Sequence, residues 1–462
     1  MRNRNVRDFI RVASSQFIGM IISIFRSLIL PLYLGVLEYG YFQSYLFYVS
    51  LIPIIALGYN DGIYLKYGNY EYEDLPFRRL SYSNNIFIVV SLILAIVIFS
   101  ISCIFVEDVN LQRIIFLSCI YGFFLAINTL LMQILQVTRR FQLYSKVTVL
   151  TKLSSLLLIL FVLCLGGNFL WIILVDVISF SLITFYLVYI NKRLFSIKYE
   201  LDAFYDYRES IKAGFPLLIA GLIGLLYLGA GRLIVQVLGG MEDFSYYSFS
   251  LSIASFVSIA ISSVSLVVYP MLSRYKGHEQ IIFYNTCNSY VRILILFIPI
   301  IYYITYMMIK WFYQDYISVL QYLNVVFIMM YIQAFMYILH NTYYKVQRLE
   351  RSLFIDNLIS VFILFLIGIP VYYHTRQIFA VSIVTLSAML IRYFISIWRL
   401  SKTMNIKLPY NTIELSFALL FIIATSYSNV SLCSIILVLS ISLLYCFHNR
   451  SEFKGLIKYI FK

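Results

Sequence analysis

The chain has 462 residues, of which 62% are hydrophobic and only 12% are charged. Soluble globular proteins carry roughly a quarter charged residues, so this chain does not have enough polar groups to cover its surface, and a soluble fold is excluded. Its mean hydropathy of +0.87 predicts an integral membrane protein. The formal net charge of +14 has a simple source, because cytoplasmic loops of membrane proteins collect Lys and Arg, and it does not indicate a nucleic-acid partner.

Fourteen segments are apolar enough to be predicted as membrane spans, for which roughly 20 apolar residues are needed in a helix. In chain order they lie approximately at 9–34, 41–63, 83–105, 114–137, 147–165, 171–190, 213–238, 249–273, 281–309, 317–344, 353–373, 378–400, 415–428 and 431–447. The last two are short, so twelve is the alternative count. Because backbone groups in lipid must be satisfied within each segment, we expect an all-α integral membrane protein.

Basic residues are distributed very unequally between the loops. If the N-terminus is cytoplasmic, 25 of the 35 basic residues fall in inner loops and tails, and only Arg113, Lys310 and Arg376 fall in outer loops. This asymmetry follows the positive-inside rule and predicts that both termini are cytoplasmic, which also requires an even number of spans. The first span has no small-residue cleavage site, so we expect it to remain as a signal anchor.

The longest internal hydrophilic stretch, Asn191 to Lys212, divides the first twelve predicted spans into six plus six. We therefore expect an N-terminal six-helix lobe over 1–190, a cytoplasmic linker over 191–212, a C-terminal six-helix lobe over 213–400, and a C-terminal helix pair with a basic tail over 401–462. Two six-helix lobes around a central cavity are the predicted architecture.

A short repeat supports this division. The stretch RSLILPLYLGVLEYGYFQ begins at Arg26, and RLIVQVLGGMEDFSYYSF begins at Arg232. Each has an Arg within the helix, a glycine (Gly35 or Gly239) and a Glu three residues after that glycine, although the Arg-to-Gly spacing is nine in one and seven in the other. This pattern favours two parallel halves, an arrangement found in some transporters.

Seven basic residues remain inside the predicted spans. Arg11 and Arg399 lie near inner helix ends, where long side chains can reach the interface. The other five lie deeper, and each costs at least ~2.5 kcal/mol at the bilayer centre. These five are Arg26, Lys152, Arg232, Arg292 and Arg392. Three acidic residues, all toward helix ends, are available to pair with them: Asp61, Asp176 and Asp356. The same three residues are candidates for ion coupling.

This excess of cations predicts a water-filled cavity that the five basic residues line. A cationic cavity attracts an anion, and phosphate fits best because Arg can hold it through two parallel hydrogen bonds. Arg26 and Arg232 are the strongest candidates, since they occupy related places in the two halves. The alternative is that these cations pair with Asp, Glu or backbone carbonyls inside the bundle.

The sequence carries no enzyme signature. Its four histidines are scattered, its six cysteines have no metal-ligand spacing, and no glycine-rich phosphate loop occurs. The predicted outer loops are at most about ten residues long, too short to build a catalytic domain. We therefore expect a protein that is not an enzyme and that uses neither a cofactor nor a bound metal.

Two stretches resemble a known family. The segment LGVLEYGYFQSYLFYVSLIPIIALGYNDGIYLKYGNYEYEDL, from Leu34 onward, is similar to the polysaccharide transporters, the Wzx-type flippases of bacterial O-antigen and capsule clusters. The matching features include the acidic residue before YG and the Gly58, Asp61 and Gly62 pattern. GRLIVQVLGGMEDFSYYSFS resembles the family's second-half signature. There the family often has Asp before the Arg, whereas this chain has Gly231 before Arg232.

The resemblance implies the fold of the multidrug, oligosaccharidyl-lipid and polysaccharide exporters. It also implies an undecaprenyl-pyrophosphate-linked oligosaccharide as substrate, moved between leaflets of the bacterial cytoplasmic (inner) membrane in lipopolysaccharide or capsule biosynthesis. Membrane lipid, a polysaccharide polymerase and a chain-length regulator are the partners it suggests. Coupling to protons or sodium fits the mechanism, but the sequence does not identify the ion.

Two other functions remain open at this point. A multidrug exporter of the same fold would be expected to place acidic residues in the lobes to bind cationic drugs, and the cation excess disfavours it. An O-antigen polymerase or ligase would typically carry a large outer loop with arginines, which this chain lacks.

Overall fold

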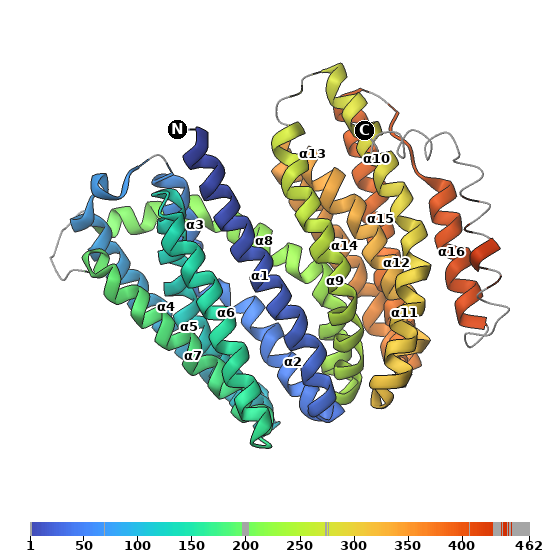
Figure 1. Cartoon of the computed structure of the whole chain (residues 1–462), viewed down its shortest axis with the longest axis horizontal. Coiled ribbons are helices and arrows are strands. Elements are labelled where there is room, and N and C mark those ends of the chain that lie inside the picture. Colours follow the sequence, from blue (N-terminus) through green and yellow to red (C-terminus); the bar gives the residue numbers. More distant parts are fainter. Residues whose placement is uncertain are drawn as a thin grey trace. The chain divides into compact units, whose positions relative to one another are not determined.

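The computed structural model describes residues 2–427 apart from 69, 196–202, 273–274, 276 and 406, and beyond 427 only 436, 438–440, 442 and 445. All regular elements in this part of the chain are helices (Figure 1). Ten are long and apolar enough to cross a membrane, or eleven if one bent pair is counted as a single span. The predicted all-α membrane fold is confirmed, whereas most of the predicted span at 431–447 lies outside the described residues.

The chain divides into two compact units, Met1–Leu225 and Leu226–Lys462. The boundary falls inside a single 37-residue helix, α8 (Ala203–Gly239), which therefore contributes to both units. This helix begins within the segment predicted as a linker over 191–212. Its first turns carry Asp, Arg, Glu and Lys, and these charged residues led to the prediction of a loop. The same turns also contain the apolar and aromatic residues of one packed helix face.

The first unit is built from helices that pack pairwise in the order α1 on α6, α6 on α7, α7 on α5, and α5 on both α4 and α2. Their bounds are α1 (Arg2–Tyr33), α2 (Val36–Leu51), η1 (Ile52–Ala56), α3 (Tyr59–Lys66), η2 (Tyr72–Asp74), α4 (Phe77–Phe105), α5 (Val109–Val137), α6 (Phe141–Cys164), α7 (Phe169–Ile190) and η3 (Lys192–Phe195). Asp108 and Asn168 start α5 and α7 as N-caps, each accepting hydrogen bonds from backbone N–H groups of the first turn.

The predicted span at 41–63 is bent rather than straight. Helix α2 tightens into the 3₁₀ turn η1 and then restarts as α3 at an angle of 60°. Leu57 and Gly58 make the break, with φ values of 49° and 81°. Gly58 adopts this left-handed conformation without the Cβ clash that other residues meet.

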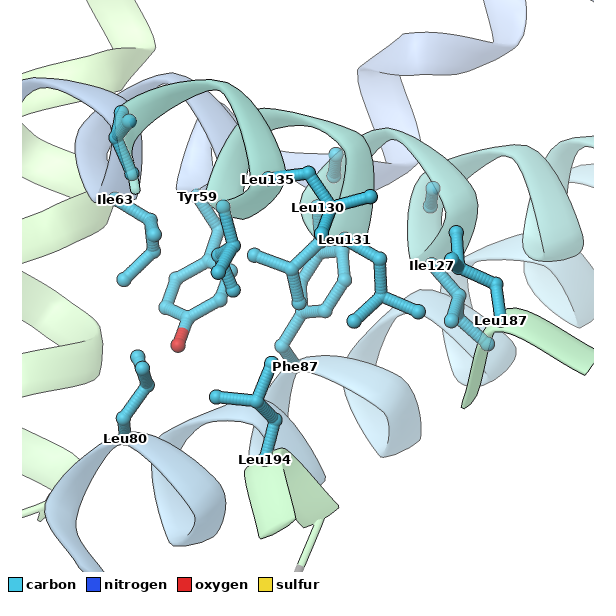
Figure 2. Close-up of a cluster of buried hydrophobic side chains, with 14 of the residues drawn as sticks. Tyr59, Ile63, Leu80, Phe87, Ile127, Leu130, Leu131, Leu135, Leu187 and Leu194 are labelled. Atoms are coloured by element: carbon cyan, nitrogen blue, oxygen red, sulfur yellow. The ribbon is translucent and has the colours of Figure 1, made fainter. Parts of the chain in front are cut away.

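A cluster of buried apolar side chains forms the core at one end of the first unit. It joins residues of α3, α4, α5 and α7 with Leu194 of η3, as Figure 2 shows around Tyr59 and Phe87. The rings of Tyr59 and Phe87 stack with centroids 4.7 Å apart. The Tyr59 hydroxyl is 2.8 Å from both Ser83 Oγ and Asn84 Oδ1, so this buried phenol is satisfied.

The second unit contains the end of α8 and the helices that follow. Their bounds are α9 (Met241–Leu272), α10 (His278–Ile293), η4 (Leu294–Leu296), α11 (Phe297–Phe312), η5 (Gln314–Gln321), α12 (Leu323–Ala334), η6 (Phe335–His340), α13 (Asn341–Val346), α14 (Glu350–Thr375), α15 (Ile378–Met404) and α16 (Thr412–Tyr427). Helix α12 lies at the centre, packed on α9, α11, α15 and α16, and all its residues are buried. It continues through η6, a single π-helical segment.

Candidate functional site

The structure brings three of the predicted site residues together in the first unit: Arg26 from α1, Lys152 from α6 and Asp176 from α7. Arg26 Nη1 lies 3.5 Å from Asp176 Oδ1. Lys152 is close enough to both for their charges to act on it. Helices α1, α6 and α7 pack in sequence, so the three side chains meet although up to 150 residues separate them in the chain.

Asp176 is buried, with 5% of its surface exposed, and it has partners besides Arg26. Its Oδ2 accepts a hydrogen bond of 3.0 Å from the hydroxyl of Tyr45 on α2, and its Oδ1 accepts one from Ser155 Oγ on α6. The carboxylate would therefore keep two donors if Arg26 turned away. A buried carboxylate needs such donors because an unpaired buried charge is very costly.

Arg26 retains free donors for a ligand. Both of its hydrogen bonds in the described part of the chain, to Asp176 and Ser155, are 3.5 Å long and use Nη1. Its side chain is 20% exposed, and its guanidinium lies 5.6 Å from the centre of the Phe42 ring. Because a guanidinium carries five N–H donors, Nε and Nη2 remain to bind an anion.

The charges of this group do not balance. Arg26 pairs with the carboxylate of Asp176, and Lys152 lies near enough to both to be influenced by their charges, on helices that are all candidate membrane spans. Lys152 precedes Ser155 by three residues on α6, so the two occupy neighbouring positions on one helix face. With both basic residues charged, the group has one more positive charge than Asp176 neutralises, which fits an anion held by one fork-shaped donor and one point charge.

Arg232 lies at a matching position in a helix that reaches into the second unit. Arg26 precedes the last residue of α1, Tyr33, by seven positions, and Arg232 precedes the last residue of α8, Gly239, by seven positions. The distance of each arginine from the end of its helix is therefore the same, whereas the spacing from arginine to glycine differs between the two stretches.

The position before Arg232, Gly231, is tightly enclosed by side chains. A Cβ built at Gly231 would lie 2.9 Å from the Tyr247 hydroxyl and 3.0 Å from Thr385 Oγ1. Tyr247 and Thr385 are both fully buried and their hydroxyls are 3.5 Å apart. The space that an Asp side chain would need is thus already filled by these two hydroxyl groups.

Thr385 also occupies the place in α15 that Asp176 occupies in α7. Each is seven residues after the first residue of its helix, Ile378 or Phe169. The first unit therefore has a carboxylate at this depth, whereas the second unit has a hydroxyl.

The other predicted cations have partners inside the bundle. Arg292 Nε lies 2.6 Å from Oε1 of Glu414, a residue of α16 that is 1% exposed. The expectation of only three acidic partners was thus incomplete. Glu414 was missed because it directly precedes the apolar run predicted at 415–428 and was counted with the loop.

Arg392 is buried, with 3% exposed, and makes no ion pair that the structure records. Its Nη2 donates a 2.9 Å hydrogen bond to Asn341 Oδ1, and its guanidinium lies 4.3 Å from the centre of the Tyr227 ring. These contacts match the alternative interpretation, in which a buried cation is stabilised by polar and aromatic groups within the bundle.

Arg399 was expected to extend toward the interface, but its Nη2 lies 2.8 Å from Asp356 Oδ1, which is part of a buried carboxylate on α14. Tyr344 also donates to this carboxylate. Asp61, on α3, is half-buried and accepts a hydrogen bond from Gln133 Nε2 at 3.2 Å. Asp356 belongs to the second unit, and Asp61 has Gln133 as its recorded partner in the first unit.

Two residues of the first-unit site were not singled out from the sequence. Tyr45 and Ser155 hold Asp176, but the chain has 42 Tyr, and Ser is common in membrane helices, so neither carries a local signal. Only the packing of α2 and α6 against α7 reveals them.

A family model described as "Polysaccharide biosynthesis protein" matches residues 6–276, which is more than half of the chain and includes all of the first-unit site. The chain belongs to this family. The match covers the two sequence stretches that resembled polysaccharide transporters, so the predicted family is confirmed. No curated protein matched this member of the family in a sequence search.

Solved structures show the same fold at low identity. A lipid II flippase MurJ in an inward closed conformation aligns with a TM-score of 0.64 and 13% identity over 96% of this chain and 99% of that one. A multidrug resistance MATE transporter of the MOP superfamily, in an outward-facing conformation, gives a TM-score of 0.54 and 14% identity over 86% and 95%. A MOP superfamily transporter from Pyrococcus furiosus, described as having a binding pocket of reverse polarity, gives 0.51 and 12% over 86% and 95%. This polysaccharide biosynthesis protein therefore has the fold of these transporters.

Proposed function

We propose that this protein is a flippase that moves an undecaprenyl-pyrophosphate-linked oligosaccharide, an O-antigen or capsule repeat unit, across the bacterial cytoplasmic membrane by alternating access. The observation that carries the proposal is the grouping of two basic residues, Arg26 and Lys152, beside the carboxylate of Asp176 on helices long and apolar enough to span a membrane. A site with net positive charge inside the membrane fits an anionic headgroup. It does not fit a cationic drug.

The residues of the site would divide the work of holding a pyrophosphate. The Arg26 fork would bind two phosphate oxygens, and Lys152 would add a second positive charge. Asp176 would compete with the phosphate for Arg26, so that the arginine returns to a protein partner when the substrate leaves. Tyr45 and Ser155 would lower the energetic cost of separating Arg26 from Asp176, because both donate hydrogen bonds to the carboxylate.

The family membership supports the sugar part of the substrate. The fold similarity to a lipid II flippase supports the lipid-linked form. The lipid tail would remain in the bilayer while the headgroup crosses. A polysaccharide polymerase and a chain-length regulator would then act on the delivered repeat unit, and no catalytic step is assigned to this chain.

The test is substrate flipping in cells. The gene is deleted and restored as wild type, Arg26→Ala or Lys152→Ala, with Arg193→Ala as a control because this residue is exposed and its recorded ion-pair partner is Glu73, outside the site. Surface polysaccharide and lipid-linked repeat units are measured, and protein levels are checked by immunoblot.

We expect the deletion to lose surface polymer and to accumulate single lipid-linked repeats on the inner leaflet. Wild type and Arg193→Ala should restore the polymer, whereas Arg26→Ala and Lys152→Ala, present at normal levels, should not. If single repeats reach the surface without the protein and only chain length is lost, the protein acts in polymerisation. If the deletion changes only sensitivity to cationic drugs, it is a multidrug exporter.

A further inference from the structure

Small residues bring the backbones of α3 and α8 into direct contact in the first unit. A Cβ built at Gly62 would lie 1.9 Å from the carbonyl oxygen of Ser210, and one built at Gly214 would lie 1.9 Å from the carbonyl oxygen of Gly58. No side chain larger than hydrogen fits at either glycine unless the helices move apart. The contact is therefore backbone against backbone.

The contacting residues of α8 lie on one face of the helix. Tyr207, Ser210 and Gly214 have the i, i+3, i+7 spacing of such a face. Tyr207 is buried, with 6% exposed, and its ring centre lies 5.2 Å from that of Tyr59 in the core cluster of Figure 2. Tyr207 thus anchors this section of α8, while Ser210 and Gly214 set how closely it approaches α3.

An ion pair closes the end of the same contact. Lys66, the last residue of α3, places its Nζ 2.9 Å from Asp206 Oδ1 and 3.6 Å from Glu209 Oε2. The Lys66 side chain is 34% exposed. Exposed pairs of this kind contribute little to stability, so this one adds specificity to the contact without locking it.

Between the contact and the boundary of the first unit, two glycines of α8 have no close neighbours. A Cβ built at Gly221 or Gly224 would meet nothing within 4 Å. Pro216 also lies within the helix, where it removes a backbone hydrogen bond. The unit boundary at Leu225 follows directly. Prolines and glycines are the usual sites of helix bending, so this section of α8 can bend at low cost.

We infer that the contact of Gly58, Gly62 and Lys66 with Asp206, Glu209, Ser210 and Gly214 is a reversible latch, which releases the first turns of α8 from α3 and closes again. The inference rests on the proposed transport function, in which the latch would open once per cycle while α8 bends at Gly221 and Gly224. A glycine contact suits this role because no interlocked side chains have to be repacked when it separates.

The test measures opening directly. Ser210 is 3% exposed and donates a hydrogen bond to the carbonyl of Asp206. Ser81, on α4, is 0% exposed and donates to the carbonyl of Arg78. The variants Ser210→Cys and Ser81→Cys are therefore a matched pair of buried helical hydroxyls, one in the latch and one outside it.

Both variants are exposed to a polar maleimide in membranes opened on both faces, and labelling of each cysteine is followed by peptide mass spectrometry. We expect Ser210→Cys to be labelled at least about tenfold faster than Ser81→Cys, because local opening exposes some buried positions and leaves others protected. Adding Lys66→Ala should speed the labelling of Ser210→Cys about two- to fivefold, the range that an exposed ion pair contributes.

Gly214→Ala should speed labelling further, whereas Gly35→Ala, the same substitution in open space between α1 and α2, should not. Equal rates for Ser210→Cys and Ser81→Cys would overturn the latch, as would equal effects of the two alanine substitutions. Lys66→Ala changes only a partly exposed side chain, so it keeps the test valid if Gly214→Ala fails to fold. The labelling needs no substrate, so its result is independent of whether the flipping experiment supports the proposed function.

Discussion

Arg292 and Glu414 form a buried ion pair that joins α10 to α16, with Nε and Oε1 only 2.6 Å apart. The hydroxyl of Tyr445 donates to the same Glu414 oxygen at 2.7 Å. Asn288 and Asn411 exchange two side-chain hydrogen bonds of 3.0 and 2.9 Å near the start of α16. The C-terminal helix α16 is thus fastened to the second unit by polar groups as well as by packing.

Removing one partner of this ion pair should destabilise the protein strongly. Arg292→Ala removes the cation beside the buried Glu414 carboxylate, and breaking a buried pair in this way costs about 3–5 kcal/mol. The double variant Arg292→Met with Glu414→Leu should lose less than Arg292→Ala. The measurement is thermal unfolding of the purified protein in detergent.

Arg193→Ala is the control, because its 3.7 Å pair with Glu73 is largely exposed, and exposed pairs are worth about 0–1 kcal/mol. If Arg292→Ala were as mild as Arg193→Ala, Glu414 would be stabilised by other groups and the structural role of Arg292 would be wrong.

Asn324 should stabilise the C-terminal end of α16. Its amide nitrogen donates to Thr425 Oγ1 and to Ser426 Oγ, each at 2.9 Å. Asn324→Leu removes these bonds, each worth about 1 kcal/mol, so amides of α16 should exchange about fivefold faster in a hydrogen-exchange experiment. Asn128→Leu, which removes a 3.2 Å bond to Thr184 in the first unit, should leave α16 unchanged. Equal exchange in both variants would contradict this role.

A side chain at position 231 should conflict with Tyr247. Gly231→Ala places a methyl group within 3.1 Å of three side-chain atoms, and such overpacking costs about 1–3 kcal/mol. In a Tyr247→Phe background the nearest of these atoms, the hydroxyl, is absent, so the same substitution should cost less. Thermal unfolding of the four proteins in this double-mutant cycle measures the difference, and equal costs in both backgrounds would show that Tyr247 does not restrict the site.

The shape of the cation at position 26 should matter as well as its charge. Arg26→Lys keeps the charge but loses the fork that could bind two oxygens, so we expect export of lipid-linked repeats to fall about tenfold. Lys152→Arg, which keeps a charge at a position proposed to act as a point charge, should retain most activity. The readout is surface polysaccharide per unit of protein. Full activity of Arg26→Lys would mean that this residue contributes only charge.

The membrane fold could be predicted because lipid imposes a simple pattern, runs of apolar residues that end at charged loops. The bend between α2 and α3 lies inside one such run, and only the backbone angles of Leu57 and Gly58 reveal it. The start of α8 at Ala203 was not predicted, because a helix that begins among charged residues has the composition of a loop.

Arg26 and Lys152 were predicted to line one cavity with three other cations, and Asp176 as a possible partner, but the sequence did not indicate which of these residues meet. Arg26, Lys152 and Asp176 stand out as ionised residues in apolar segments, so composition alone identified them. Their meeting depends on how α1, α6 and α7 pack, and this long-range contact has no trace in the local sequence. For the same reason the sequence could not show that Arg292 pairs with Glu414. Nor could it show that Arg26 has N–H donors left for a ligand.

The π-helical segment Phe335–His340 has a consequence for comparing the two halves of the chain. Its wider turn accommodates an extra residue, and one residue in an α-helix corresponds to a rotation of about 100°. Asn341, which holds Arg392, therefore lies on a different side from the one that a helical wheel drawn from Leu323 would assign. An alignment of the two halves should be tested with a one-residue gap here, the expected mark of a single-codon insertion after an ancestral duplication.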